Sequence, residues 1–363
     1  MNRNQCTRSI CHHRPGGRNP ANVLADLQAE VGFYDAPDHY GQGNLISTFE
    51  SEVAELLGKE EAVFLPSGTM AQQLALRVWC EWSGMPYVAF SHTSHLELHE
   101  EKGYNLLHGL HSTLLGCTKR PLRPSDFERL PTSCTAVVIE LPEKEFGGHL
   151  IDWQDLVSIS RRLRSRDVKL HLDGARLWEC VPAYDKSLAQ IASLFDSVYV
   201  SFYKSLGSIG GAVLASNSDF ISEIRIWQRR CGGNLIELWP YILSARHALK
   251  HRLKLIPKYV EHTKKMAKFL ESHETIRVVP AEPRTNMAQI HMCGDRSALV
   301  KAAIAVSART KVWIFGDLTE SSFPNWHRFD FVAGEGSLDV SPEETATLLK
   351  EVVSIAALQE RAQ

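Results

Sequence analysis

Residues 198–216, "VYVSFYKSLGSIGGAVLAS", place a lysine where an apolar segment ends and a turn begins. The segment starts as a buried strand would, Lys204 follows it, and the turn contains Gly207, Gly210 and Gly211. Lysine is among the residues least often buried, so this position needs a physical reason. One interpretation is a side chain whose stem covers the strand end while its ammonium reaches water. The other is an amine desolvated enough to condense with an aldehyde, and this interpretation predicts partner residues elsewhere in the chain.

The composition is that of a globular protein with nearly balanced charge. Of the 363 residues 44% are hydrophobic, which is enough for a large core and predicts two domains. The 40 Lys and Arg nearly cancel the 42 Asp and Glu, so no net field favours nucleic acid or an anionic membrane. We therefore expect a small-molecule partner, with no nucleic acid and no membrane.

The N-terminal segment has no targeting signal that we can identify. "MNRNQCTRSICHHRPGGRNP" lacks an apolar core of signal-peptide length, and no apolar run in the chain is long enough to span a bilayer. The eight cysteines are scattered without a regular framework, which suits reduced thiols. These features predict a cytoplasmic protein.

One local cluster contains the residue types that bind metal ions, namely Cys6, Cys11, His12 and His13. Its spacing lacks the paired ligands of a zinc site. We therefore expect no metal and interpret residues 1–40 as a polar N-terminal arm.

From about residue 45 helical and strand patterns alternate, which is typical of a parallel sheet with crossover helices. Buried strands are expected at 62–66, 87–90, 135–141, 168–173 and 197–202, and helices at 47–60, 69–80 and 152–167, the last capped by Asp152. The pattern predicts an α/β fold with a doubly wound, mostly parallel sheet in a large domain, residues 41–245.

The C-terminal part has a different pattern. A long helical stretch covers residues 237–272. Beyond it, strand patterns at 275–280, 287–292, 311–315 and 327–334 are interleaved with helical patterns near 296–308 and 341–360. They predict a smaller α+β C-terminal domain, residues 246–363, whose boundary lies inside a helical region and not in a flexible linker.

Asp173 in "VKLHLDGARLWE" ends another apolar strand, and Gly174 begins the next turn. Taken alone, Asp173 could cap the helix that follows. With Arg176 three residues further on, its carboxylate could also hold a protonated ring nitrogen. Ligands of open α/β sheets bind at the carboxyl ends of the strands, where Lys204 also lies, so the second interpretation is open.

A third segment at this edge is "VFLPSGTMAQQ", in which Ser67, Gly68 and Thr69 open a helix. Free backbone donors, two hydroxyls and the positive end of the helix dipole suit a phosphate group. Helix starts often carry Ser and Thr, so this segment alone is a weak signal. Beside the lysine itself lie Ser201 and Ser205.

A lysine amine, a carboxylate for a pyridinium nitrogen and a phosphate cradle together describe pyridoxal 5'-phosphate held as a Schiff base. The combination is far more specific than its parts. It answers the question that the lysine raises, because Lys204 would carry the aldehyde cofactor.

At these residues the chain resembles the β-eliminating lyase and threonine aldolase family of fold-type I pyridoxal phosphate enzymes. The segments "PSGTMAQQLAL", "HLDGARLWE" and "SFYKSLGSIGGAVLA" match the family's signature segments in order. The match extends through "SHLELHEEKGYNLLHGL" and "ELPEKEFGGHLIDWQDLVSIS" and covers roughly residues 40–250.

The resemblance implies a cofactor role for several residues. Lys204 would form the Schiff base, Asp173 would pair with the pyridine nitrogen, and the phosphate would lie on Gly68 and Thr69, with Ser67 and Ser201 as further cofactor contacts. His95 in "SHTSHLELHE" falls where the family has a histidine stacked on the ring and available for proton transfer. A core histidine is the alternative for His95, and His92 and His99 lie close by in the sequence.

Two arginines match positions that bind the substrate carboxylate in the family. They are Arg176 and, in the C-terminal "WHRFDFVAG", Arg328. Bidentate pairing is a physical reason for arginine at such a place. A salt-bridged surface arginine is the alternative for Arg328.

Three segments depart from the family pattern. The N-terminal "NQCTRSICHHRPGGRNP" has no clear equivalent of the family's "RSDT" segment. Glu143 in "ELPEKEFGG" lies near the place of a usual histidine, and Ile236 in "CGGNLIE" stands where an arginine is usual. The wall that faces the substrate has changed, so threonine as the specific substrate is an open point.

The resemblance implies retro-aldol cleavage of a β-hydroxy-α-amino acid, of the L-threonine or L-allo-threonine type, to glycine and an aldehyde. His95, or a water that it orders, is the first candidate for the base that takes the β-hydroxyl proton, and Glu143 is the second. The resemblance also implies a homodimer or a homotetramer.

Two other functions remain open at this stage. A β-eliminating lyase would use the same Lys204 and Asp173 and would release a keto acid and ammonia. A non-catalytic protein that binds pyridoxal phosphate or uses the fold as a scaffold would have no physical need for Lys204, Asp173 and His95 together.

Overall fold

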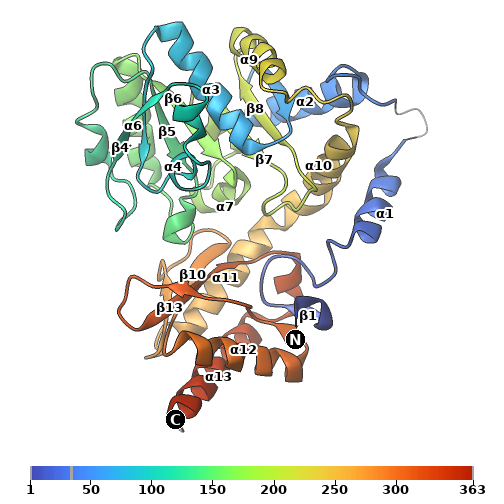
Figure 1. The fold of residues 1–363 in the computed structure, drawn as a ribbon, viewed down its shortest axis with the longest axis vertical. Helices are drawn as coiled ribbons and strands as arrows, with labels where there is room; N and C mark the ends of the chain where they lie inside the picture. The colour runs from blue at the N-terminus through green and yellow to red at the C-terminus, as the bar shows by residue number, and fades with distance from the viewer. Residues whose placement is uncertain (1, 33–35, 362–363) are drawn as a thin grey trace. The chain divides into compact units, whose positions relative to one another are not determined.

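The structure is a computed structural model that describes residues 2–32 and 36–361 (Figure 1). It contains two compact units, a larger one of residues 26–142 and 150–253, and a smaller one of residues up to 25, 143–149 and from 254 onward. The domain limits expected from the sequence, 1–40, 41–245 and 246–363, stay a prediction.

A seven-stranded sheet with the order β2-β8-β7-β6-β5-β3-β4 forms the centre of the larger unit. Neighbouring strands are parallel except where β8 pairs with β2 and β7. The prediction of a mostly parallel sheet is therefore confirmed, although β4 and β8 are not among the predicted strands. The strands are β2 (Glu61–Leu65), β3 (Tyr87–Ser91), β4 (His111–Leu115), β5 (Ala136–Glu140), β6 (Lys169–Gly174), β7 (Ser197–Ser201) and β8 (Ala212–Ser216).

Helices cover both faces of this sheet, as the alternation of side chains along β2 shows. Val63 belongs to a buried cluster with side chains of α3 (Gly68–Ser83) and α9 (Ser218–Arg230). Phe64 points to the opposite face, where its ring centroid lies 6.0 Å from that of Phe49 in α2 (Asn44–Leu57). The sheet is thus the middle of three layers, and both of its faces are apolar.

The remaining helices of the larger unit include the predicted crossover helix. Residue Asp152 occupies the N-cap position of α6, as predicted. The helices are α4 (His95–Leu98), α5 (Gly103–Leu106), α6 (Trp153–Ser165), α7 (Cys180–Tyr184), α8 (Leu188–Ala192) and α10 (Trp239–Arg252); α1 (Pro20–Glu30) begins before residue 26 and ends in the larger unit. Within the described ranges, none of the helices combines the length and the apolar character needed to cross a membrane.

The smaller unit contains a four-stranded antiparallel sheet with the order β12-β13-β10-β9 and a parallel pair, β1 with β11. The antiparallel sheet, together with helices α11, α12 and α13, confirms the predicted α+β organisation. The β1–β11 pair joins residues near the N-terminus to the C-terminal part. The elements are β1 (Arg8–Ser9), β9 (Ile276–Val279), β10 (Met287–Cys293), β11 (Val312–Trp313), β12 (Thr319–Glu320), β13 (Trp326–Val332), α11 (Ile256–Leu270), α12 (Arg296–Thr310) and α13 (Pro342–Arg361).

The long helical stretch expected at 237–272 consists of two helices. The first, α10, ends at Arg252, a short 3-10 turn covers Leu253–Leu255, and α11 begins at Ile256. Pro257 lies in the first turn of α11, where its missing N–H costs no helical hydrogen bond. The same ring disfavours a continuous helix through the preceding residues, which explains why the stretch divides here.

The turn that follows Lys204 depends on a glycine with positive φ. Gly211 has φ +92°, and a Cβ at this position would overlap the ring of Phe64. The Phe64 ring is itself held against Phe49, so it cannot easily move away. Only glycine fits this backbone conformation and this space.

We therefore predict that Gly211→Ala destabilises the protein more than alanine at another glycine with positive φ. Gly84, with φ +70°, has no heavy atom within 4 Å of an added Cβ, and Gly84→Ala should lose about 1 kcal/mol from backbone strain alone. Gly211→Ala should lose about 1–3 kcal/mol more because of overpacking. Urea unfolding of both variants measures the difference, and equal losses would contradict the packing argument.

Candidate active site

A pocket in the larger unit gathers side chains from the carboxyl ends of three strands and from the start of α3. Asp173 of β6 is in register with Glu140 of β5 and with Tyr199 of β7, so the three ends lie side by side. The pocket is lined by Gly68, Thr69, Gln72, His95, Glu140, Asp173, Ala175, Arg176, Tyr199, Tyr203 and Lys204. The structure thus brings together six of the residues selected from the sequence, namely Gly68, Thr69, His95, Asp173, Arg176 and Lys204.

Asp173 is a buried residue whose carboxylate accepts a hydrogen bond from the backbone nearby. The residue is 1% exposed, and its Oδ1 accepts a hydrogen bond from the N–H of Ala175 at 3.1 Å. Burial raises the pKa of Asp173, the Ala175 N–H and the charges of His95 and Arg176 oppose the rise, and Glu100 adds to it. A cation placed against this carboxylate would offset the cost of its burial.

The alternative role for Asp173, as a helix cap, is not the one that the structure shows. The next helical turn begins at Leu177, and its N-cap position is Arg176. The carboxylate instead accepts the N–H two residues on, which holds the turn at the strand end. Asp173 is also one of the residues that line the pocket.

The start of α3 has the features of a phosphate cradle. Ser67 is the N-cap, and its Oγ accepts the N–H of Met70 at 3.2 Å. A Cβ at residue 68 would overlap the hydroxyl of Tyr199, so glycine is required and the backbone is open to the pocket. The helix dipole adds a positive potential at this point. These observations fit a phosphate group.

Two tyrosines that sequence reasoning did not select lie beside this helix start. The hydroxyls of Tyr199 and Tyr203 are 3.3 Å apart. Burial raises the pKa of Tyr203, and hydrogen bonds with Tyr199 and with the backbone of Gly68 oppose the rise. Both phenols therefore stay protonated near neutral pH and act as neutral hydrogen-bonding groups at the cradle.

Lys204 lines the same pocket three residues after the end of β7. Its Nζ lies 5.1 Å from the centroid of the Tyr203 ring, within the range of a cation–π contact. The amine is therefore next to both the cradle and the Asp173 strand end. Of the two interpretations of this lysine, the structure favours a position at a pocket over a stem that only covers a strand end.

The hydroxyl of Ser201 has a structural partner. It donates to the carbonyl oxygen of Ala175 at 2.8 Å and so ties the end of β7 to the turn after Asp173. Ser201 is buried, and it is not among the residues that line the pocket. Its contact with a cofactor stays a prediction.

His95 is held by a buried carboxylate. Its Nδ1 lies 2.9 Å from Oε1 of Glu100, and Glu100 also accepts hydrogen bonds from the amides of Gln72 at 3.2 Å and Gln73 at 2.9 Å. The Glu100 carboxylate can only accept, so neutral His95 carries its proton on Nδ1 and keeps Nε2 as an acceptor. His95 lines the pocket, whereas His92 and His99 do not.

Glu179 is a second buried carboxyl that the sequence did not reveal. It is 0% exposed and lies on the short helical turn after Arg176. Burial raises the pKa of Glu179 to about 7, while the charge of Arg176 and the hydroxyl of Ser205, next to Lys204, oppose the rise. The protonation state of Glu179 thus changes near neutral pH, close to Arg176 and to Ser205.

Glu143 and Arg328 belong to the smaller unit. Glu143 is buried, and its Oε2 lies 3.0 Å from Nδ1 of His149. Arg328 lies on β13, in register with His291 of β10 and with Thr319 of β12. Their roles toward substrate stay predictions.

Some of the missed residues had a signal in the sequence and others had none. Glu140 ends a predicted strand, so the rule that selected Asp173 could have selected it as well. Glu100 and Glu179 lie in acidic or helical segments with no distinguishing pattern, and only packing shows that they are buried.

Comparisons with known proteins agree on one family. The sequence model described as beta-eliminating lyase matches residues 19–293. A low-specificity L-threonine aldolase from Candida albicans is 30% identical over 271 residues, which are 69% of this chain and 70% of that protein.

Two solved structures are similar over nearly the whole chain. One from Exiguobacterium sp. 255-15, provisionally assigned as an aromatic amino acid β-eliminating lyase/threonine aldolase, is 36% identical with a TM-score of 0.91 and covers 98% of this chain and 100% of that one. The other, from Listeria monocytogenes and provisionally assigned as an L-allo-threonine aldolase, is 38% identical with a TM-score of 0.91 and covers 96% of each chain.

The buried carboxyl of Glu179 predicts a pH-dependent stability difference. Its pKa is raised from 4.5 to about 7 in the folded state, so its contribution is fully present below pH 4.5 and is lost as the pH rises through 7. Glu179→Gln does not titrate and should therefore gain about 2–3 kcal/mol relative to the parent protein between pH 5 and pH 8.

Thermal unfolding at the two pH values measures this gain. The control is Glu128→Gln, because the side chain of Glu128 is 57% exposed, and this variant should follow the parent at both pH values. A Glu179→Gln variant that also follows the parent would show that Glu179 is charged in the folded protein.

Proposed function

The chain belongs to the beta-eliminating lyase family, and from this membership we propose that it cleaves a β-hydroxy-α-amino acid of the L-threonine type to glycine and an aldehyde. The observation that carries the proposal is the pocket in which Lys204, Asp173 and His95 meet the start of α3. The similarity to the Candida albicans threonine aldolase, and to the Listeria monocytogenes protein provisionally assigned as an L-allo-threonine aldolase, supports the substrate class.

The enzyme is a pyridoxal phosphate-dependent lyase of fold type I. The donor set of the pocket fits this cofactor: Lys204 would hold its aldehyde carbon, Asp173 its ring nitrogen, and Ser67, Gly68 and Thr69 its phosphate. When bound, pyridoxal phosphate supplies an electron sink for the bond that breaks at the substrate α-carbon.

The side chains of the chain then have separate tasks. Asp173 would pair with the ring nitrogen and favour its protonated form, because a buried carboxylate with a raised pKa gains from a cationic partner. Arg176 would bind the substrate carboxylate and orient the bond between the α- and β-carbons, and the same role for Arg328 rests on the family resemblance alone. Nε2 of His95, an acceptor while Nδ1 donates to Glu100, takes the proton of the β-hydroxyl. Glu143 is the second candidate for this base.

A β-elimination is the second candidate function, and the family description favours it. It would use the same Lys204 and Asp173 but a substrate with a leaving group at the β-carbon. The products separate the two functions, since one reaction releases glycine and an aldehyde and the other a keto acid and ammonia.

Assembly and location belong to the proposal as well. We propose a homodimer or a homotetramer, as the resemblance to fold-type I enzymes implies, because each active site in such enzymes usually lies at a dimer interface. We propose a cytoplasmic location, because the scattered cysteines of the sequence suit a reducing compartment.

The first prediction of this function concerns Lys204. Protein reconstituted with pyridoxal phosphate should release glycine and an aldehyde from L-threonine, L-allo-threonine or phenylserine, and Lys204→Ala should abolish this release because the amine that holds the cofactor is lost. Both product pairs, aldehyde with glycine and keto acid with ammonia, should be assayed in the same samples.

Lys301→Ala is a matched control, because Lys301 is an exposed lysine of α12 in the smaller unit. It should keep full activity. Keto acid and ammonia from the parent protein would move the assignment to β-elimination. An active Lys204→Ala variant would contradict the role of Lys204 in both lyase functions.

The second prediction concerns the hydrogen bond between His95 and Glu100. In Glu100→Gln the carboxylate that accepts from Nδ1 becomes a neutral amide, whose oxygen accepts more weakly and whose NH2 can donate to Nδ1. The tautomer of His95 that keeps Nε2 as an acceptor therefore loses stability. We expect kcat to fall by about tenfold or more, equivalent to at least ~1.4 kcal/mol, with little change in KM.

Glu97→Gln is the control for this variant. Glu97 lies on α4, the short helix that begins with His95. Its carboxylate accepts a hydrogen bond from Tyr104 and forms an ion pair with Lys102. If both variants lose the same activity, the loss reflects the stability of this helix and not the tautomer of His95. Cofactor absorbance, recorded for both, shows whether the pocket is intact.

A further inference from the structure

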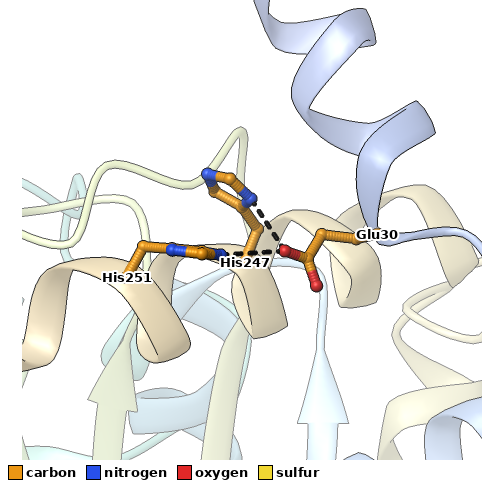
Figure 2. Close-up of side chains that lie close together, drawn as sticks. All are labelled: Glu30, His247 and His251. Atoms are coloured by element: carbon orange, nitrogen blue, oxygen red, sulfur yellow. Dashed lines mark hydrogen bonds and ion pairs between the residues drawn. The ribbon is translucent and has the colours of Figure 1, made fainter.

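Two histidines and a glutamate, none of which lines the pocket, form a cluster on α1 and α10 (Figure 2). His247 and His251 are one turn apart on α10, and Glu30 is the last residue of α1. Oε1 of Glu30 lies 3.2 Å from Nδ1 of His247 and 3.0 Å from Nε2 of His251. Within residues 2–32 and 36–361, this is the only group of three His, Cys, Asp or Glu side chains close enough to hold one metal ion.

The two oxygens of Glu30 have different surroundings. Oε1 faces both histidines and lies 3.5 Å from the ammonium of Lys250, which is closer, at 3.3 Å, to Oε2. Burial acts to raise the pKa of Glu30, but hydrogen bonds from His251, Lys250 and His247 outweigh it and lower the pKa. Glu30 is therefore a carboxylate at neutral pH, and its Oε1 lies within hydrogen-bond distance of one ring nitrogen of each histidine.

A second carboxylate completes the surroundings. Oδ2 of Asp26 lies 3.9 Å from Nε2 of His247, the nitrogen that faces away from Glu30. When both histidines are neutral, the two carboxylates and one Lys250 ammonium leave a local charge that favours a cation. The pair of Asp26 and His247 also resembles the arrangement in which a carboxylate orients a histidine that binds metal through its other nitrogen.

We propose that Glu30, His247 and His251 bind a divalent transition-metal ion of the zinc class, with water as the fourth ligand. Two imidazole nitrogens and one carboxylate oxygen are the donors that Zn²⁺ accepts in three-residue sites. Bonds of about 2.0–2.1 Å in a tetrahedron place neighbouring donors about 3.3 Å apart, close to the separations of 3.0 and 3.2 Å between Oε1 and the two nitrogens.

The nature and exposure of the donors decide the class of the ion. Mg²⁺ and Ca²⁺ prefer sites made of oxygen atoms alone, so the two imidazoles disfavour them. The side chain of His251 is 44% exposed, whereas those of His247 and Glu30 are 18% and 12% exposed. An ion can thus enter, and keep a water ligand, on the side of His251.

The place of the cluster gives the ion a structural consequence. The helix α10 contacts the turn that follows Lys204: Oγ of Ser244 accepts the N–H of Ile209 at 3.0 Å, and the guanidinium of Arg252 donates to the carbonyl of Leu206 at 3.1 Å. His247 and His251 lie between these two anchor residues. A bound ion would fasten the end of α1 to the helix that holds the lysine turn.

The missed signal in the sequence is the spacing of His247 and His251. Two histidines four residues apart on a helix share one face. The expectation of no metal considered only the cluster of Cys6, Cys11, His12 and His13, whereas the group of possible ligands found among the described residues is Glu30, His247 and His251. Glu30 is far away in the sequence, so the third ligand could not be recognised there.

The test is zinc binding by the holoenzyme after chelator treatment and dialysis. Titration with zinc chloride at pH 7.5, read by calorimetry, should show one ion per chain, and a scan should show a higher thermal midpoint with zinc than without. His247→Ala and His251→Ala should each weaken the binding by more than tenfold. Co²⁺ in place of zinc should give the visible absorption of a tetrahedral site, which adventitious surface binding does not give.

Two further variants keep the test decisive. Glu30→Gln keeps the size of the side chain but removes its charge, so it should weaken binding even if the alanine variants fold poorly. His273→Ala, at a histidine outside the cluster, should bind as the parent does. No stoichiometric binding by the parent protein, or equal binding by Glu30→Gln and the parent, would overturn the proposal. Because binding is measured without substrate, these outcomes are independent of the lyase function.

Discussion

The buried carboxylate of Asp173 is the constraint around which the site is arranged. At 1% exposure it has lost its water, and the groups that oppose the raised pKa are one backbone N–H and the charges of His95 and Arg176. A carboxylate in such surroundings is stabilised by a cation or gives up its charge. A protonated pyridine nitrogen is a cation of the right kind, and the lysine and the phosphate cradle lie at the same edge of the sheet.

The rest of the pocket depends on close packing between segments that are distant in the sequence. Gly68 must lack a Cβ because the Tyr199 hydroxyl occupies the space beside it, and this keeps the start of α3 open. The lysine turn is held in a similar way, by the missing side chain of Gly211 against Phe64 and by hydrogen bonds from α10. Both the cradle and the amine are thus positioned by rigid elements, as a site for a bulky cofactor requires.

Most of the architecture was predictable because buried strands and amphipathic helices leave periodic patterns. The prediction failed where the pattern was weak or where packing was decisive. Strand β4 contains His111, Ser112 and Thr113 and lies at the edge of the sheet, so it lacks the apolar run of a central strand. The helical stretch at 237–272 has a continuous helical pattern, yet it divides near Pro257 for a steric reason.

The sequence by itself determined the chemical groups of the site, because Lys204, Asp173 and Gly68 each stand at a strand end or helix start that neighbouring residues define. It also determined the family, through segments that are continuous in the chain. Only the tertiary structure decided which groups support them. Glu100 holds His95 through a burial that no local pattern shows, and Glu30 meets His247 across 217 positions of sequence. Such contacts arise when separate elements pack together, and local sequence contains no record of that packing.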